Sequence, residues 1–161
     1  MESKIELELL SEEIYPQLLL INRDDISEDF VDSVERIIEI SEYGKEHNLI
    51  GHTYAVKCEG KYIGIVLMGE AIIWKTDPPE MKKEPFYRIV GFIIDKAYRQ
   101  KGIGAYVLEK SISQIYEEFG IRPIALGCHK DNISAEKFYL NHGFKKTEYM
   151  EGNDYYFLRF P

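Results

Sequence analysis

The fold of this chain is decided by the stretch Arg99-Gln100-Lys101-Gly102-Ile103-Gly104, which joins an apolar run over residues 86–94 to a segment with helical periodicity that begins at Ala105. Two glycines let a backbone bend and approach an anion closely, and the free N–H groups of a first helical turn point toward phosphate oxygens. The stretch therefore predicts a pyrophosphate cradle, with Arg99 adding a positive charge. Glycines also occur in such turns for purely conformational reasons, so the neighbouring sequence has to decide.

Two better-known phosphate motifs do not fit. The Walker pattern G-x-x-x-x-G-K-[ST] is absent from the sequence, and the dinucleotide fingerprint needs a third glycine where Val107 stands. Downstream come a helical segment to Gly120, a short apolar strand over residues 123–128, and then a second motif. That motif is N-x-x-A-x-x-x-Y-x-x-x-G-F, formed by Asn132, Ala135, Tyr139, Gly143 and Phe144.

Together the two motifs resemble the GNAT superfamily of acetyl-CoA-dependent N-acetyltransferases, in which the same two patterns follow an apolar strand and are separated by a helix and a second strand. The resemblance implies an α/β fold whose mixed, mostly antiparallel sheet has splayed central strands and flanking helices. We expect residues 1–161 to form a single N-acetyltransferase domain, because this length suits one buried core and is short for two.

The bulk composition narrows the class further. No apolar run approaches the roughly 18 residues of a membrane span, and the charged first residues lack a signal-peptide segment, so we expect a cytoplasmic protein without membrane contact. Cys58 and Cys128 stand in apolar strand-like sequence, which favours buried thiols over a disulfide or a nucleophile. The four scattered histidines give no metal-binding pattern, so no metal is expected.

The net charge of −8 is unevenly distributed along the chain. Residues 1–46 carry fourteen Asp or Glu against four Lys or Arg, whereas the remainder has fourteen acids and sixteen bases. A nucleic-acid partner is disfavoured because such proteins normally present a basic face, while an acidic segment can steer a cationic ligand. The alternative interpretation is a solvated acidic helix face.

Hydrophobic periodicity predicts the order of the remaining elements. A short helix is expected from Ser11 to about Ile21, and a second from Ser27 to near Gly44 with an apolar stripe. Asn132 is expected to cap a further helix, and Gly143 to follow it in the left-handed conformation. Residues 75–85 are expected to form a loop, and strands are expected over residues 5–9, 53–58, 62–68, 86–94, 123–128, 144–150 and 155–160.

The resemblance also implies a binding mode for the co-substrate, acetyl-CoA. The pantetheine arm would lie along Phe92, Ile93 and Ile94, one of whose N–H groups would stabilise the thioester oxygen. The glycine loop through Ala105 would hold the pyrophosphate, and Asn132 and Lys137 would add contacts. Tyr139 is predicted to be the general acid that protonates the departing thiolate, since phenol and thiol pKa values are close enough for proton transfer.

The general base is not fixed by a motif. An amine must lose a proton before it attacks, so a carboxylate or a water relay is expected; the candidates are Glu70 first, then Glu28 and Glu84. His129, just past the second strand, is another candidate, although a surface position is expected for it.

The acceptor is predicted to be a small cationic amine, because the early acidic helices would border the acceptor groove; Glu28, Glu35 and Glu84 are the expected substrate-binding residues. The chain is similar to bacterial diamine or spermidine acetyltransferases, except that several of those carry an acid on the central strand where this chain has Arg88, Val90 and Gly91. Protein or peptide amines and aminoglycosides stay open as acceptors. So do a non-catalytic acyl-CoA-binding regulatory module and an interaction domain that docks through residues 27–42; family members often dimerise, which makes a homodimer one alternative.

Overall fold

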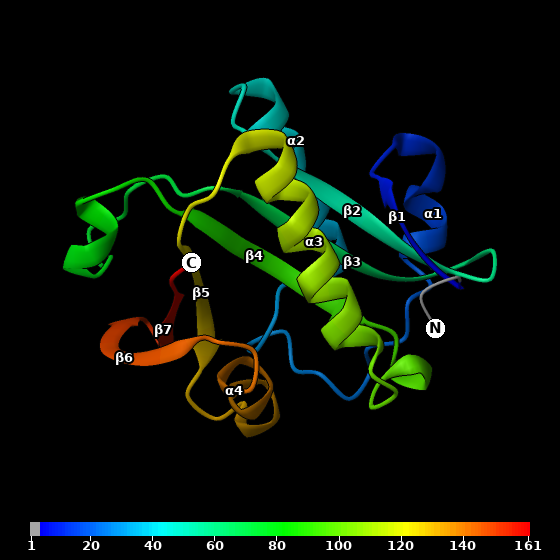
Figure 1. Cartoon of the computed structure of the whole chain (residues 1–161). Helices are drawn as coiled ribbons and strands as arrows, with labels where there is room; N and C mark the ends of the chain where they lie inside the picture. The colour runs from blue at the N-terminus through cyan, green and yellow to red at the C-terminus, as the bar shows by residue number, and fades with distance from the viewer. Residues whose placement is uncertain (1–3) are drawn as a thin grey trace.

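A computed structural model describes residues 4–161 as a seven-stranded sheet with helices on both faces (Figure 1). The strand order is β1-β2-β3-β4-β5-β7-β6, and all neighbours are antiparallel except β4 and β5. The mixed, mostly antiparallel sheet is therefore confirmed. The strands are β1 (Ile5–Leu9), β2 (Gly51–Cys58), β3 (Lys61–Glu70), β4 (Tyr87–Ile94), β5 (Ile124–His129), β6 (Lys145–Glu151) and β7 (Asp154–Arg159).

The helices are α1 (Tyr15–Leu18), α2 (Val34–Glu46), α3 (Ile103–Phe119) and α4 (Ile133–Leu140), with short 3₁₀ turns at Glu12–Ile14, Pro79–Lys82 and Lys96–Tyr98. Figure 1 shows α3 crossing in front of β2 to β4 while α2 lies behind the sheet. Alternate residues of each strand serve the two faces, as a pleated strand requires. On β3, for example, Val66 and Met68 pack with α3, whereas Ile65 and Leu67 pack with α2. Among residues 4–161, no helix is both long and apolar enough to span a bilayer.

The central feature of the sheet is the divergence of β4 from β5. The two strands pair only from Tyr87 to Ile89 on β4 and from Ile124 to Leu126 on β5. Immediately after Ile89, the register between β3 and β4 shifts by one residue, which leaves Val90 as a β-bulge. A bulge bends its strand, so β4 turns away from β5 and a gap opens between them.

The second helix begins later than the sequence predicts. Its N-cap is Ser33, whose Oγ accepts a hydrogen bond from the Arg36 N–H at 3.1 Å, rather than Ser27. Ser27 instead closes a local turn by accepting from the Asp29 N–H at 3.1 Å. The Arg23 guanidinium donates to the carbonyl oxygens of Ile26, Ser27, Val31 and Asp32, which holds residues 26–32 as a loop.

Smaller differences between the predicted and observed elements have the same cause, because tertiary contacts override the local sequence signals. The first helix ends at Leu18, three residues before Ile21, and the Ser11 side chain makes no capping hydrogen bond. The hairpin of β2 and β3 is confirmed, as is the closing hairpin of β6 and β7. In the sheet, however, β7 lies between β5 and β6, so the turn after Glu151 lies next to the end of β5.

Cys128 is buried and Cys58 is half-buried, and both are free thiols.

Candidate active site

The gap between β4 and β5 exposes backbone groups of β4 that would otherwise pair. The Asp95 N–H donates to the Ile63 carbonyl on β3 at 2.7 Å, so alternation along the strand turns the Ile94 and Phe92 backbone groups away from β3 and toward the gap. In agreement, the Ile94 carbonyl accepts from Arg99 Nε at 2.8 Å. The Ile93 N–H points toward β3. The gap therefore offers an extended ligand a backbone edge with Phe92 at its centre.

The glycine loop forms the N-terminus of α3. Gln100 and Gly102 have left-handed backbones, with φ of 59° and 79°, and Gly102 is the N-cap. A glycine there avoids the steric penalty of a Cβ. The first helical hydrogen bond runs from the Tyr106 N–H to the Gly102 carbonyl at 3.1 Å, so the N–H groups of the first turn have no intrahelical acceptor. The first turn of α3 therefore has N–H groups available to an acceptor outside the helix, at the position where the sequence predicts a pyrophosphate cradle.

The Arg99 side chain folds back toward the gap instead of extending into solvent. Besides its bond to Ile94, its guanidinium forms an ion pair with Asp25. The third nitrogen, Nη2, is buried and finds no hydrogen-bond partner within the described part of the chain. The other charged residues assigned to the coenzyme are less constrained: Lys101 lies 5.8 Å from the centre of the Tyr98 ring, and Lys137 is exposed on α4.

Helix α4 places a tyrosine at the gap. Asn132 caps the helix by accepting from the Ala135 N–H at 3.2 Å, as predicted, and Gly143 follows with φ of 83°. Tyr139 makes edge-on contacts with Phe138 and Phe144, at ring-centre distances of 5.3 and 5.5 Å. Burial raises the pKa of Tyr139 above its ordinary value, so its hydroxyl is protonated at neutral pH and can only donate a proton.

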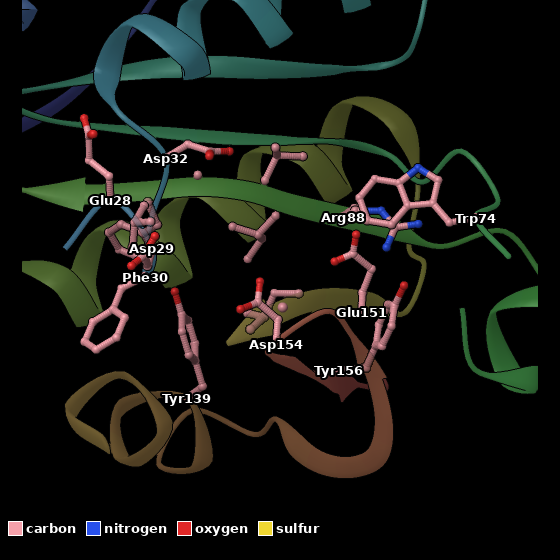
Figure 2. Close-up of a pocket in the computed structure, with 17 residues that line it drawn as sticks. Glu28, Asp29, Phe30, Asp32, Trp74, Arg88, Tyr139, Glu151, Asp154 and Tyr156 are labelled. Atoms are coloured by element: carbon pink, nitrogen blue, oxygen red, sulfur yellow. The ribbon is translucent and has the colours of Figure 1, made fainter. Parts of the chain in front are cut away.

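A cavity of about 360 Å³ lies in the gap, between β4, β5, α4 and the loop before α2. Figure 2 shows Tyr139 rising into it from α4 and Asp154 from β7, with the loop acids on the opposite side. Its lining carries five carboxylates and a single basic side chain, Arg88. The carboxylates are Glu28, Asp29, Asp32, Glu151 and Asp154.

The single arginine of this cavity is already neutralised. Arg88 Nη2 pairs with Asp77 at 3.0 Å, and both side chains are almost fully buried. The Trp74 ring covers the guanidinium at 3.7 Å, and the Tyr156 hydroxyl donates to Asp77 at 2.7 Å. These contacts fasten the β3–β4 loop to β4 and β7, and they leave the cavity strongly negative.

A second groove of about 770 Å³ runs between α2 and the ends of β2 and β3. It shares Asp32, Trp74, Arg88 and Val90 with the cavity, so the two hollows are continuous. Glu70 lines this groove rather than the Tyr139 cavity, and its Oε1 accepts from the Ile50 N–H at 2.8 Å.

The structure brings together only some of the predicted substrate residues. Glu28 lines the cavity, whereas Glu35 and Glu84 are exposed and line neither hollow. His129 is not at the surface as expected, because its side chain is only 10% exposed and packs against Phe30 at 4.8 Å.

Several lining residues escape sequence reasoning. Asp29 and Asp32 belong to the acidic excess that the sequence shows, but Glu151, Asp154 and Trp74 carry no local signal. They reach the cavity because β7 inserts beside β5 and because Asp77 fastens the β3–β4 loop. No group of three or more His, Cys, Asp or Glu in residues 4–161 is arranged to hold a metal ion.

The fold has many relatives among solved structures. It is similar to the PaiA N-acetyltransferase from Thermoplasma acidophilum in complex with coenzyme A, with a TM-score of 0.69 and 19% identity over 98% of this chain and 99% of that one. It is also similar to the Salmonella typhimurium acetyltransferase that modifies the N-terminal serine of ribosomal protein L7/L12, with a TM-score of 0.68 and 17% identity over 97% and 92%. A third is Ard1 from Thermoplasma volcanium, with a TM-score of 0.67 and 17% identity over 97% of each chain.

These likenesses define the fold as that of the N-acetyltransferases. The sequence profile described as the acetyltransferase (GNAT) family matches residues 15–144, and the chain belongs to that family. A search of curated protein sequences found no match.

Proposed function

We propose that this protein transfers the acetyl group of acetyl-CoA to a primary amine of a small cationic molecule, with a polyamine as the first choice, and that Tyr139 is the general acid. The observation that carries the proposal is the acidic cavity in the β4–β5 gap. Five carboxylates converge there while Arg88 is held by Asp77, so the cavity attracts a cation and disfavours an anion.

Acetyl-CoA would enter from the opposite end of the gap. The α3 N-terminus would hold its pyrophosphate, together with Arg99, whose Nη2 has no partner among residues 4–161. The pantetheine arm would pair with the backbone of Phe92 and with the Ile94 N–H, since the Ile94 carbonyl is taken by Arg99. This orientation brings the thioester to Tyr139, where the arm ends and the acidic cavity begins.

Tyr139 suits the departure of the CoA thiolate. The thiolate needs a proton as the C–S bond breaks, and the Tyr139 phenol, whose pKa is raised by desolvation, carries one at neutral pH. Tyr139→Phe keeps the ring contacts with Phe138 and Phe144 and removes only the hydroxyl. We expect turnover to fall by about a hundredfold or more while the KM for acetyl-CoA stays within about twofold.

The direct test is release of CoA thiol from acetyl-CoA with purified protein and a panel of amines. Spermidine, spermine and putrescine are the supporting substrates, and aminoglycosides, lysine peptides and peptides with free N-termini are the comparison. Turnover confined to the polyamines supports the acceptor assignment. If no amine on the panel releases CoA, the acceptor assignment is refuted. If acetyl-CoA nevertheless raises the melting temperature, the protein is a non-catalytic acyl-CoA sensor.

A peptide N-terminus is the second candidate acceptor. The cavity opens into the groove beside α2, which has room for a chain that extends away from the reacting amine. In addition, one structural neighbour modifies the N-terminal serine of a ribosomal protein. Peptides starting with serine, alanine or methionine, each with a free and a blocked terminus, would distinguish this acceptor from a side-chain or small-molecule amine.

A further inference from the structure

Asp154 differs from the other carboxylates of the cavity in its burial. It is the first residue of β7 and lies opposite His129 of β5 in the strand register. Glu28, Asp29, Asp32 and Glu151 are all solvent-exposed, whereas Asp154 is half-buried. Figure 2 shows its carboxylate and the Tyr139 hydroxyl directed into the same space below β4. Asp154 is therefore the carboxylate placed deepest in the gap.

The absence of a side chain at Gly127 leaves room for Asp154 beside β5. A Cβ at Gly127 would lie 3.3 Å from both the Cβ and Oδ2 of Asp154, so the aspartate packs over the bare backbone of β5. Among residues 4–161, no donor makes a hydrogen bond or ion pair with the Asp154 carboxylate, and the neighbouring His129 instead accepts through Nδ1 from the Asp131 N–H at 3.1 Å. By contrast, Glu70 is occupied by the Ile50 N–H. Asp154 thus packs against the β5 backbone, and its carboxylate is free to take a proton.

The charges around Asp154 favour a proton acceptor of moderate strength. Burial raises the pKa of Asp154, the nearby His129 lowers it, and the carboxylates of Glu151 and Asp32 raise it again, with a net increase above its ordinary value. Arg88 and Tyr139 also face the cavity, but Arg88 is paired with Asp77. A carboxylate with a raised pKa is a stronger base than one in water.

An amine acceptor needs such a base. An amine with a pKa near 10.4 is protonated in all but about 1 in 2,500 molecules at pH 7, which costs roughly 4.6 kcal/mol if the free base must be found in solution. The acidic cavity increases this cost, because it stabilises the ammonium form. A group that removes the proton inside the cavity lowers the cost.

We propose that Asp154 is the general base of the reaction, an inference that rests on the proposed function. Its carboxylate takes one proton from the acceptor ammonium, directly or through one water, and the nitrogen lone pair then attacks the thioester carbon. The C–N bond forms and the C–S bond breaks. As the adduct collapses, Tyr139 gives its proton to the CoA sulfur, the second nitrogen proton passes directly or through water to the Tyr139 phenolate, and Asp154 releases its proton to solvent.

The test is the pH dependence of kcat/KM for Asp154→Asn, measured with an amine that the wild type acetylates. At pH 7 we expect a loss of about a hundredfold or more, with the KM for acetyl-CoA unchanged. Between pH 7 and 9 the kcat/KM of the variant should rise by about tenfold per pH unit, because the amine then deprotonates in solution. The kcat/KM of the wild type should change less over this pH range. Glu148→Gln, which removes an exposed carboxylate of β6 outside the cavity, is the matched control.

Folding and function can be separated in this variant. Asparagine has the shape of aspartate, and the raised pKa means that ionised Asp154 costs stability at neutral pH, so the melting temperature should stay equal or rise. Asp154→Glu, which keeps the carboxylate, should retain more activity than Asp154→Asn. Asp154→Ala with added formate gives a further check, since formate restores only a missing carboxylate.

The outcomes distinguish the base from the function. If Asp154→Asn keeps kcat/KM within threefold of the wild type and follows the same pH profile, Asp154 is not the base although the protein is an acetyltransferase. If the wild type acetylates no amine on the panel, the proposed function fails and the base assignment fails with it.

Discussion

The contact between Gly91 and Ile37 predicts a strong energetic coupling between β4 and α2. Gly91 follows the β-bulge at Val90, and a Cβ at this position would lie 2.5 Å from Cδ1 and 2.6 Å from Cγ1 of Ile37. Ile37 is fully buried in the core between α2 and the sheet. Since its side chain cannot move into solvent, Gly91→Ala must force Ile37 into another rotamer within the core or push α2 away from the strand.

The expected cost follows from overpacking. Extra methyl groups in a well-packed core typically cost about 1–3 kcal/mol, and a chain of this size loses about 2–4 °C in melting temperature per kcal/mol. Gly91→Ala should therefore lower the melting temperature by about 4–8 °C for a cost near 2 kcal/mol. The loop with Glu28 and Asp32 precedes α2, so the KM for the amine should rise as well.

Ile37→Ala removes all three atoms that the new methyl group would meet. Alone, it should cost about 2–5 kcal/mol as a large-to-small core substitution. Combined with Gly91→Ala, the total should be smaller than the sum by about 1–3 kcal/mol, since the methyl group then occupies the vacated space. Urea unfolding of the wild type, both single variants and the double variant, followed by circular dichroism, measures this coupling.

Gly44→Ala is the matched control, because a Cβ there would meet no heavy atom within 4 Å. Within α2 it should stabilise by about 0.5–1 kcal/mol and be additive with Ile37→Ala. If Gly91→Ala and Ile37→Ala were also additive within about 0.5 kcal/mol, the packing argument for Gly91 would be refuted.

Two further perturbations have defined outcomes. Asp77→Ala leaves Arg88 buried without its partner and should lower the free energy of unfolding by about 3–5 kcal/mol, measured by urea unfolding at pH 7. Burial raises the pKa of Asp77, but the bonds from Arg88, Trp74 and Tyr156 outweigh it and hold that pKa below the ordinary 3.8. The contribution of Asp77 to the free energy of unfolding is therefore complete above about pH 5 and is lost as the pH falls further. Asp77→Ala should reduce this dependence of stability on pH. Gly102→Ala places a methyl group at φ of 79° and should raise the KM for acetyl-CoA severalfold at little change in kcat; an unchanged KM would argue against the α3 N-terminus as the anion site.

The parts of the fold that sequence could predict are those set by neighbours along the chain. Gly102 requires a left-handed backbone, and the Asn132 side chain bonds a backbone N–H three residues on, so both signals act within one turn. The start of α2 was predicted wrongly for the same reason. Ser27 and Ser33 are locally similar caps, and the choice between them depends on Arg23, which binds the carbonyls of the intervening loop.

The site depends on contacts that no local pattern encodes. The acids at 28–32 and at 151–154 lie more than a hundred residues apart in the sequence, and they meet because β7 inserts between β5 and β6. The sequence does not show that Arg88 is paired, because its partner Asp77 lies in the loop between β3 and β4. The pair is buried under Trp74 and shapes the wall of the cavity.

The divergence of β4 and β5 explains why the two ends of the gap have opposite electrostatic character. Along β4, the strand leads to Arg99 and the free N–H groups of α3, which favour an anion. Around the gap, β7 and the loop held by Arg23 bring carboxylates, which favour a cation. An anionic coenzyme and a cationic amine would each be attracted to one end, and their reactive groups would meet between Tyr139 and Asp154. Under the proposed function, the divergence of the strands after the bulge at Val90 would let the coenzyme arm lie between these two ends of opposite charge.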